Sequence, residues 1–184
     1  MKIISGKYKG RSLKGINIEV TRPTMDRVKE SLFGMIQDYI KDSVVLDLYS
    51  GTGNLAIESI SNGCKKAYLV DKSRLAINVI NDNIKMLNID NAIVINNDAS
   101  KALKDFINKK EKIDIIFLDP PYNTNELDKI LTILNENTSI LDNNSLIICE
   151  TELKIDYSKY NNFKIYKERK YGSKLVTILK LNID

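Results

Sequence analysis

Short apolar runs alternate with stretches of helical periodicity along the chain. The apolar runs predict strands at 44–48, 67–70, 92–95, 113–118 and 145–149, and the periodic stretches predict helices at about 24–40, 54–62, 73–87, 99–109 and 125–136. Two further segments, 162–169 and 174–181, are joined through Tyr171-Gly172-Ser173 and predict a closing hairpin. This alternation favours an α/β fold with a mostly parallel seven-stranded sheet, helices on both faces and an antiparallel hairpin at its C-terminal end.

We expect one domain over residues 1–184, with a basic N-terminal arm at 1–20 and the core at 21–184. The sequence has no internal repeat, low-complexity tract or linker. It has no apolar run near the ~20 residues that a membrane helix needs, and its first residues lack the apolar segment of a signal peptide. We therefore expect a soluble, cytoplasmic monomer that does not contact a membrane.

Histidine is absent from the sequence, and there are two cysteines, Cys64 and Cys149. The lack of histidine excludes Ser-His-Asp and Cys-His nucleophile pairs as well as His-based zinc sites. The cysteines lack the CxxC spacing of a metal site, so we expect buried thiols and no bound metal. Carboxylates, backbone dipoles and a cofactor must then perform any chemistry.

The net charge of +4 is unevenly distributed along the chain. Residues 1–29 contain two acidic residues against eight basic ones, which are Lys2, Lys7, Lys9, Arg11, Lys14, Arg22, Arg27 and Lys29. A second basic cluster occurs at 164–174. Two such clusters on one face of a compact domain would suit a polyanion such as a nucleic acid.

The apolar run at 113–118 ends in Asp119-Pro120-Pro121-Tyr122. Because proline lacks an N–H group and fixes φ, this turn is stiff and presents carbonyl acceptors. A proline carbonyl and the Asp119 carboxylate can accept both hydrogens of an exocyclic amine, while the Tyr122 ring offers a face on which a base can stack. The segment predicts a site for a flat, amine-bearing group, although Asp-Pro and Pro-Pro also occur in ordinary turns.

A glycine-rich turn follows the strand at 44–48. Gly51, Gly53 and Ala56 fit the G-x-G-x-x-A pattern of dinucleotide-binding turns, and Asp71 ends the next strand, where a ribose-binding acid belongs. This pattern leaves open the interpretation that the protein is a nicotinamide-dependent dehydrogenase. Asp47 argues against that reading, because its carboxylate would repel a pyrophosphate but would attract the ammonium and sulfonium of S-adenosylmethionine.

A third strand ends before Asp98 and Ala99. Asp98 can accept from an adenine amino group or cap the next helix, and both roles stay open. The carboxyl ends of parallel strands share one edge of a sheet, where open α/β sheets bind their ligands. Four strand ends carry an aspartate, so Asp47, Asp71, Asp98 and Asp119 predict a single ligand crevice.

In this order the motifs resemble class I S-adenosylmethionine-dependent methyltransferases that modify exocyclic nitrogens of nucleobases. Residues 21–33, TRPTMDRVKESLF, further resemble the R-P-T-x-D-R-V-R-E-x-L-F signature of the RsmD family, which methylates guanine N2 in small-subunit ribosomal RNA. Segments 5–11 and 171–173 are also similar to that family, so the resemblance covers almost the whole chain. The glycine turn reads YSGTGN where the family more often has FAGSG, a departure that keeps every glycine.

The resemblance implies a Rossmann-like fold and methyl transfer from S-adenosylmethionine to N2 of guanine 966 in 16S ribosomal RNA, within the 30S subunit or an assembly intermediate. The expected catalytic residues are Asp119, Pro120, Pro121 and Tyr122. The expected cofactor contacts are Asp47, Tyr49, Ser50, Gly51, Gly53, Asn54, Asp71, Lys72, Asp98, Ala99 and Asp119. The expected RNA contacts are Lys7, Lys9, Arg11, Arg22, Arg27 and Lys29.

Two alternatives stay open besides the dehydrogenase. D-P-P-Y is shared with DNA and other RNA amino-methyltransferases, which act on adenine N6 or cytosine N4. A catalytically silent RNA-binding domain would keep the same fold. The chain lacks room for the separate target-recognition domain that many DNA enzymes carry, which favours a structured RNA as substrate.

Overall fold

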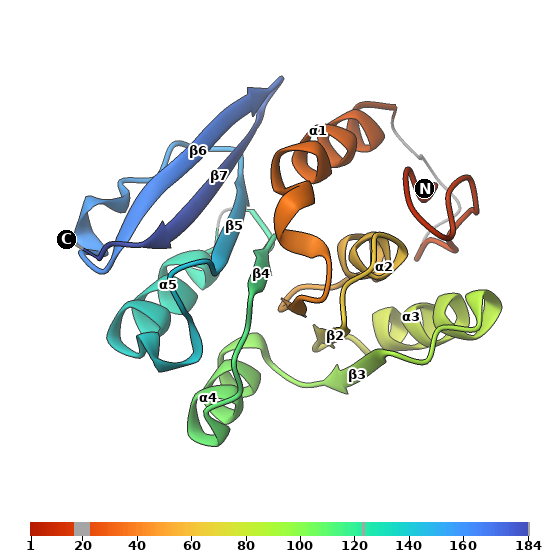
Figure 1. The fold of residues 1–184 in the computed structure, drawn as a ribbon, viewed down its shortest axis with the longest axis horizontal. Helices are drawn as coiled ribbons and strands as arrows, with labels where there is room; N and C mark the ends of the chain where they lie inside the picture. Colours follow the sequence, from red (N-terminus) through yellow and green to blue (C-terminus); the bar gives the residue numbers. More distant parts are fainter. Residues whose placement is uncertain (17–22, 123, 184) are drawn as a thin grey trace.

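The computed structural model describes residues 1–16, 23–122 and 124–183, and of residues 23–25 the backbone alone (Figure 1). Its strands are β1 Val44–Asp47, β2 Lys66–Asp71, β3 Ala92–Asn96, β4 Ile115–Leu118, β5 Leu146–Thr151, β6 Phe163–Tyr171 and β7 Lys174–Leu181. Its helices are α1 Pro23–Ile40, α2 Asn54–Ser61, α3 Arg74–Leu87, α4 Ala99–Lys109 and α5 Glu126–Glu136, with short 3-10 helices η1 Thr138–Ile140 and η2 Tyr157–Lys159. Positions 17–20 of the predicted arm lie outside the described residues.

The strands form one sheet in the order β3-β2-β1-β4-β5-β7-β6. Strands β1 to β5 pair in parallel, whereas β7 is antiparallel to both β5 and β6. The predicted fold class and the closing hairpin are therefore confirmed. Predicted boundaries differ by at most two residues, as at β4, which begins at Ile115 because the N–H of Ile113 donates instead to the Ile140 carbonyl of η1.

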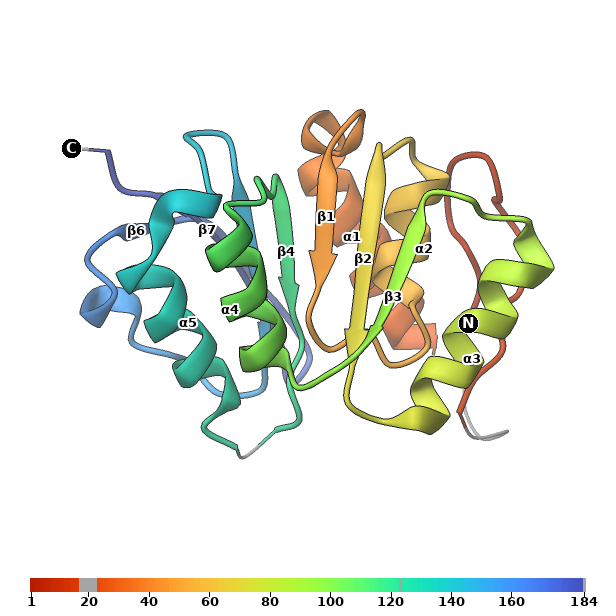
Figure 2. The ribbon, with the colours of Figure 1, turned by 90° about the horizontal axis from the view of Figure 1, so that it is seen from below.

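The sheet is covered on both faces (Figures 1 and 2). Helices α1, α2 and α3 pack on one face and α4 and α5 on the other. Successive strand residues point to opposite faces, so Val45 joins the core under α1 and α2 while Leu46 joins the core under α4 and α5. Cys64 and Cys149 are free and buried, as predicted. The helices in the described part of the chain are too short or too polar to cross a membrane.

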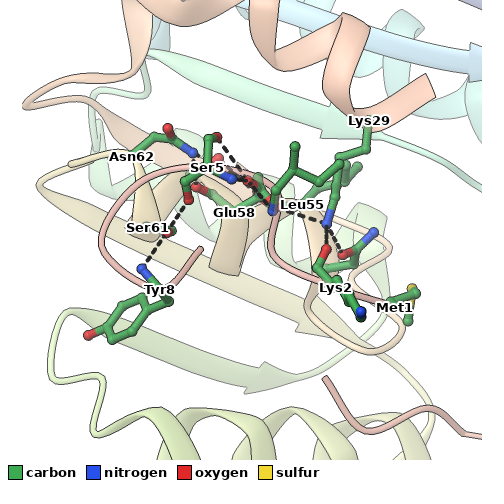
Figure 3. A network of polar contacts seen from close by, with 12 residues as sticks. Met1, Lys2, Ser5, Tyr8, Lys29, Leu55, Glu58, Ser61 and Asn62 are labelled. Atoms are coloured by element: carbon green, nitrogen blue, oxygen red, sulfur yellow. Dashed lines mark hydrogen bonds and ion pairs between the residues drawn. The ribbon is translucent and has the colours of Figure 1, made fainter. Parts of the chain in front are cut away.

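The N-terminal arm is fixed to α2 by a buried carboxylate (Figure 3). Glu58 is fully buried, and its oxygens accept hydrogen bonds from the backbone N–H groups of Ile4 and Ser5 at 2.9–3.0 Å. One turn further along α2, Ser61 donates to the Ser5 carbonyl at 2.6 Å. Gly6 fits between the segments because a Cβ there would lie 1.9 Å from the Ser61 carbonyl oxygen. Residues 3–13 of the arm are thus packed into the folded core.

Lys29 of α1 completes this network and corrects one prediction. Its ammonium lies 2.8 Å from Glu58 Oε2, 2.6 Å from the Lys2 carbonyl and 2.8 Å from Asn54 Oδ1 (Figure 3). The Lys29 side chain is 2% exposed. A cation that neutralises a buried carboxylate is not available to an RNA phosphate, so the predicted RNA contact of Lys29 is wrong.

We predict that Lys29→Met lowers the free energy of unfolding by about 3–5 kcal/mol, because it leaves the Glu58 charge buried without its partner. Urea denaturation followed by circular dichroism measures the loss. Lys14→Met is the matched control, since Lys14 pairs with Asp82 at 2.9 Å where both side chains are 57% exposed, and such pairs contribute about 1 kcal/mol or less. Equal losses in the two variants would contradict the structural role of the buried pair.

Candidate active site

Four charged side chains form a row at the carboxyl edge of the sheet. They lie on β1, directly after β4, on β5 and on β7, which are adjacent in the sheet in that order. Each charged residue lies two positions from a strand residue that packs under α1 and α2, and side chains two apart share a face. The pairs are Asp47 with Val45, Asp119 with Phe117, Glu150 with Ile148, and Lys174 with Val176. The row therefore points to the face that α1 covers.

Two cavities with shared walls open along this edge. One, of about 420 Å³, extends from Asp71 and Asp98 to Pro120 and Tyr122. The other, of about 250 Å³, lies beneath α1 and is lined by Asp47, Lys29 and Glu150 among others. Tyr49, Gly51, Asp119 and Lys174 line both. An extended ligand can thus reach from the larger cavity at the ends of β2 and β3 toward the buried carboxylate of β1.

The glycine turn shapes the wall between the cavities. The Ser50 N–H donates to the Val70 carbonyl at 3.0 Å, and the Gly51 N–H donates to Asp71 Oδ2 at 2.9 Å. Gly53 has φ of +81°, and a Cβ there would lie 3.0 Å from Leu69 Cδ2, so glycine is required by conformation and by packing. Gly53 is not among the residues that line the two cavities, and its predicted contact with the ligand stays a prediction.

Asp47 is the most buried acid of the cavity walls, at 2% exposure. Burial raises its pKa to about 7, although a hydrogen bond from the Tyr49 backbone N–H acts to lower the pKa. Its carboxylate forms no ion pair with a cation of the described residues. Such a group is stabilised when a cationic ligand enters the cavity.

Asp71 and Asp98 border the larger cavity, and each carries part of the local fold. Asp71 Oδ1 accepts from the Ser73 N–H at 2.8 Å. Asp98 caps α4, since its Oδ1 accepts from the Ser100 hydroxyl and the N–H groups of Ser100 and Lys101 at 2.6–3.2 Å. The hydrogen bond with the Ser100 side chain holds the pKa of Asp98 below its usual range. These contacts use Oδ1, so the capping role leaves Oδ2 for a ligand in the cavity.

The Asp119 carboxylate lies beside an ion pair between Glu150 and Lys174. The Tyr122 hydroxyl donates to Glu150 Oε1 at 3.3 Å, and the Lys174 ammonium lies 5.8 Å from the centroid of the Tyr122 ring. Burial, with the negative charge of Glu150, raises the pKa of Asp119 to about 7, while Lys174 opposes this shift. Burial alone would lower the pKa of Lys174, but its hydrogen bonds to Glu150 and Tyr122, together with the negative charges of Glu150 and Asp119, outweigh burial and the pKa is raised. Asp119 is therefore a carboxylate that can accept a proton near neutral pH.

Most of the predicted ligand residues come together at these cavities. The walls include Asp47, Tyr49, Ser50, Gly51, Asn54, Asp71, Lys72, Asp98, Ala99, Asp119, Pro120, Pro121 and Tyr122. Of the predicted RNA contacts, Lys7, Lys9, Arg11 and Arg27 are exposed, and Arg22 lies outside the described residues. Among the described residues, no cluster of three or more His, Cys, Asp or Glu side chains could hold a metal ion.

Sequence reasoning missed Glu150 and Lys174. Glu150 directly follows the predicted strand 145–149, which is the same signal that identified the four aspartates. Lys174 follows the hairpin turn and gave no such signal, because its place beside β5 depends on β7 inserting between β5 and β6.

Comparisons with known proteins give a consistent picture. The family model described as "Conserved hypothetical protein 95" matches residues 1–180. The chain is 37% identical to ribosomal RNA small subunit methyltransferase D of Buchnera aphidicola (strain APS), over 91% of this chain and 86% of the relative. It is 35% identical to the protein of the same name from Haemophilus influenzae, over 94% of this chain and 89% of the relative.

Solved structures share the fold. The Escherichia coli protein yhhF, named as a candidate methyltransferase, superposes with a TM-score of 0.83 at 26% identity, over 100% of this chain and 99% of the other. Another candidate methyltransferase, solved in complex with SAH, has a TM-score of 0.64 at 16% identity, over 81% of this chain and 49% of the other. At that identity the likeness concerns the fold alone.

We predict that Asp47→Asn stabilises the ligand-free protein more at pH 8 than at pH 5. An acid whose folded pKa is raised to about 7 contributes stability below its unfolded pKa of about 4, and this contribution is lost as the pH rises toward 7. The amide does not ionise, so the variant avoids the loss. Thermal unfolding at both pH values measures the difference, with Asp105→Asn on the exposed side of α4 as control. A pH-independent difference would show that Asp47 is not destabilised when ionised.

Proposed function

Because the chain belongs to the family of conserved hypothetical protein 95, the RsmD family, we propose that it methylates N2 of a guanine in 16S ribosomal RNA, at position 966, with S-adenosylmethionine as the methyl donor. Two relatives carry the name ribosomal RNA small subunit methyltransferase D. The observation that carries the proposal is that Asp119 lines both cavities, the one bordered by Pro120 and Tyr122 and the one that holds the buried Asp47.

The residues at the cavities fit S-adenosylmethionine. Asp47 is a buried carboxylate that lacks a cation among the described residues, and the ammonium of the donor would supply one. Asp71 would accept from the ribose hydroxyls, and Asp98 with Ala99 would border the adenine. The bound donor supplies an electrophilic methyl group on a sulfonium. A pyrophosphate would instead place negative charge near Asp47, which is why we set the nicotinamide alternative aside.

Asp119 would act on the amino group of the target base. The lone pair of that nitrogen is delocalised into the ring until its hydrogens are engaged, and Asp119 with the Pro120 carbonyl would accept them. Formation of the bond from N2 to the methyl carbon would break the bond from that carbon to sulfur, and N2 would release a proton. Asp119, with its pKa raised to about 7, would receive this proton. Tyr122 would stack on the base after it leaves its helix.

The basic arm would position the RNA. Lys7, Lys9 and Arg11 are exposed on a segment that Glu58 holds in place, and Arg27 is exposed on α1. Figure 1 shows the arm and the lysine-rich β6 on opposite sides of α1. We propose that these residues contact 16S RNA within the 30S subunit or an assembly intermediate. We further propose that the whole chain forms one domain, which acts in the cytoplasm as a monomer and needs no metal.

We predict that Asp119→Ala lowers the rate of methyl transfer by roughly 10²–10³-fold, because a group that stabilises charge in the transition state is lost. Binding of S-adenosylhomocysteine, measured by calorimetry, should change little. Single-turnover methyl transfer to 30S subunits measures the rate. The control variant Asp105→Asn, changed at an exposed position on α4, should keep the wild-type rate. A variant with wild-type turnover would remove Asp119 from the mechanism.

We predict that replacing Lys7, Lys9 and Arg11 with glutamine weakens RNA binding and lowers the slope of log K against log salt by roughly 2–3 units, since each lost phosphate contact removes about 0.7–0.9 units. The control replaces Lys101, Lys104 and Lys109 of α4, which changes the charge equally on the other face of the sheet.

Both triple variants and the wild type are then assayed on 30S particles, naked 16S RNA, duplex DNA and free guanosine, and the product is mapped by mass spectrometry. Methylation of guanine N2 in ribosomal substrates, reduced in the arm variant alone, supports the proposal. A preference for DNA, or methylation of adenine or cytosine, would favour the other amino-methyltransferases.

A further inference from the structure

We propose that Glu150 and Lys174 select guanine as the target base, Glu150 by accepting from N1–H and Lys174 by donating to O6. This inference rests on the proposed function and deepens it, because it assigns the choice of base to a pair of residues outside the D-P-P-Y segment. In this inference the pair recognises the base, and Asp119 takes part in the methyl transfer.

The fold places the pair next to Asp119. Strands β4 and β5 are parallel, and Leu118 is in register with Cys149, so Asp119 and Glu150 follow at neighbouring positions of the sheet edge. Glu150 is in turn opposite Val176 of β7, two residues from Lys174. The next two residues of the row after the amine-binding aspartate are therefore an acceptor and then a donor.

The same order occurs on the Watson–Crick edge of guanine. Starting from the exocyclic amine at C2, that edge presents N1–H as a donor and O6 as an acceptor. In adenine and cytosine, the ring nitrogen beside the exocyclic amine carries a lone pair. If the exocyclic amine donates to Asp119, a carboxylate at the next position accepts from N1–H of guanine. In the other two bases the same carboxylate faces the lone pair of the ring nitrogen. Glu150 would thus attract one base and repel two.

Contacts of Glu150 leave it available for this role. Both Lys174 and the Tyr122 hydroxyl donate to Oε1, so Oε2 is the oxygen that these contacts leave for a ligand. The side chains of Glu150 and Lys174 are 13% and 23% exposed, so they are mostly shielded from water yet reach the cavity walls. Tyr122 is 37% exposed and lies against the pair, and a base stacked on its ring would bring its edge to Glu150.

The pair also bridges β5 and β7, and a purely structural bridge would not distinguish bases. The test therefore compares two target bases that both carry the reactive amine. A synthetic RNA segment with guanine or 2-aminopurine at the target position is ligated into 16S RNA and assembled into 30S particles. 2-Aminopurine keeps the amine at C2 but has a lone pair at N1 and no oxygen at C6.

Wild-type protein should methylate the guanine substrate with kcat/KM roughly 10–100-fold above that for 2-aminopurine, as expected for loss of hydrogen bonds to charged groups. Glu150→Gln presents an amide N–H to the lone pair of N1 and should reduce this preference by at least tenfold, mainly by lowering activity on guanine. Glu152→Gln, the same change at an exposed position two residues along, should leave the preference unchanged.

A third substrate gives a readout that does not need transfer. Inosine keeps N1–H and O6 but lacks the amine, so RNA with inosine at the target position should compete with the guanine substrate. This competition should weaken about tenfold or more in Glu150→Gln and in Lys174→Met, and remain in Glu152→Gln.

Each outcome separates this inference from the proposed function. If wild-type protein methylates no ribosomal guanine, the proposed function fails. If it methylates guanine and 2-aminopurine equally, or if Glu150→Gln lowers both rates by the same factor, base selection by the pair is overturned while the function stands. Should Glu150→Gln unfold in thermal melts, Lys174→Met takes its place in the comparison of the two bases, and an unchanged preference in that variant overturns base selection by the pair.

Discussion

The two-residue period of the strands, combined with in-register pairing of β1, β4 and β5, is the constraint on which this molecule depends. It sends Asp47, Asp119 and Glu150 to the face under α1 and sends their apolar neighbours to the opposite core. A slip of one residue in any of these strands would bury the carboxylate under α4 and α5. Core packing and the polar row are therefore specified by the same pairing.

Two buried acids in this fold illustrate opposite solutions to one electrostatic problem. Glu58 is fully buried and is paired with Lys29 of α1 and with backbone N–H groups of the arm, so its charge is matched within the chain. Asp47 is almost as buried, but its pKa is raised to about 7, so its charge is poorly matched. A carboxylate that the fold leaves unmatched beside a cavity is a place where a ligand can supply the missing charge.

Sequence patterns predicted the order of elements and most residues of the cavity walls, because strand ends and glycine turns leave local signals. The same patterns did not show that Lys29 is buried, since a lysine in a basic stretch looks the same whether it faces solvent or a carboxylate 29 residues away. The acid that pairs with it is the only charged residue of the helix NLAIESIS, which is the signal that could have identified it. Lys174 required the non-sequential strand order, and such long-range pairing is not encoded in any short segment.

The docking of the arm on Glu58 also has a consequence for how the chain folds. Ile4 bonds to a residue 54 positions later, so the arm has no partner until α1, β1 and α2 have formed. Ile3 and Leu13, which are buried in the final structure, must stay exposed to water during that interval. As the chain emerges from a ribosome at about 5–20 residues per second, this interval lasts several seconds. The arm is thus expected to be among the last parts of its half of the domain to fold, although it is among the first to be synthesised.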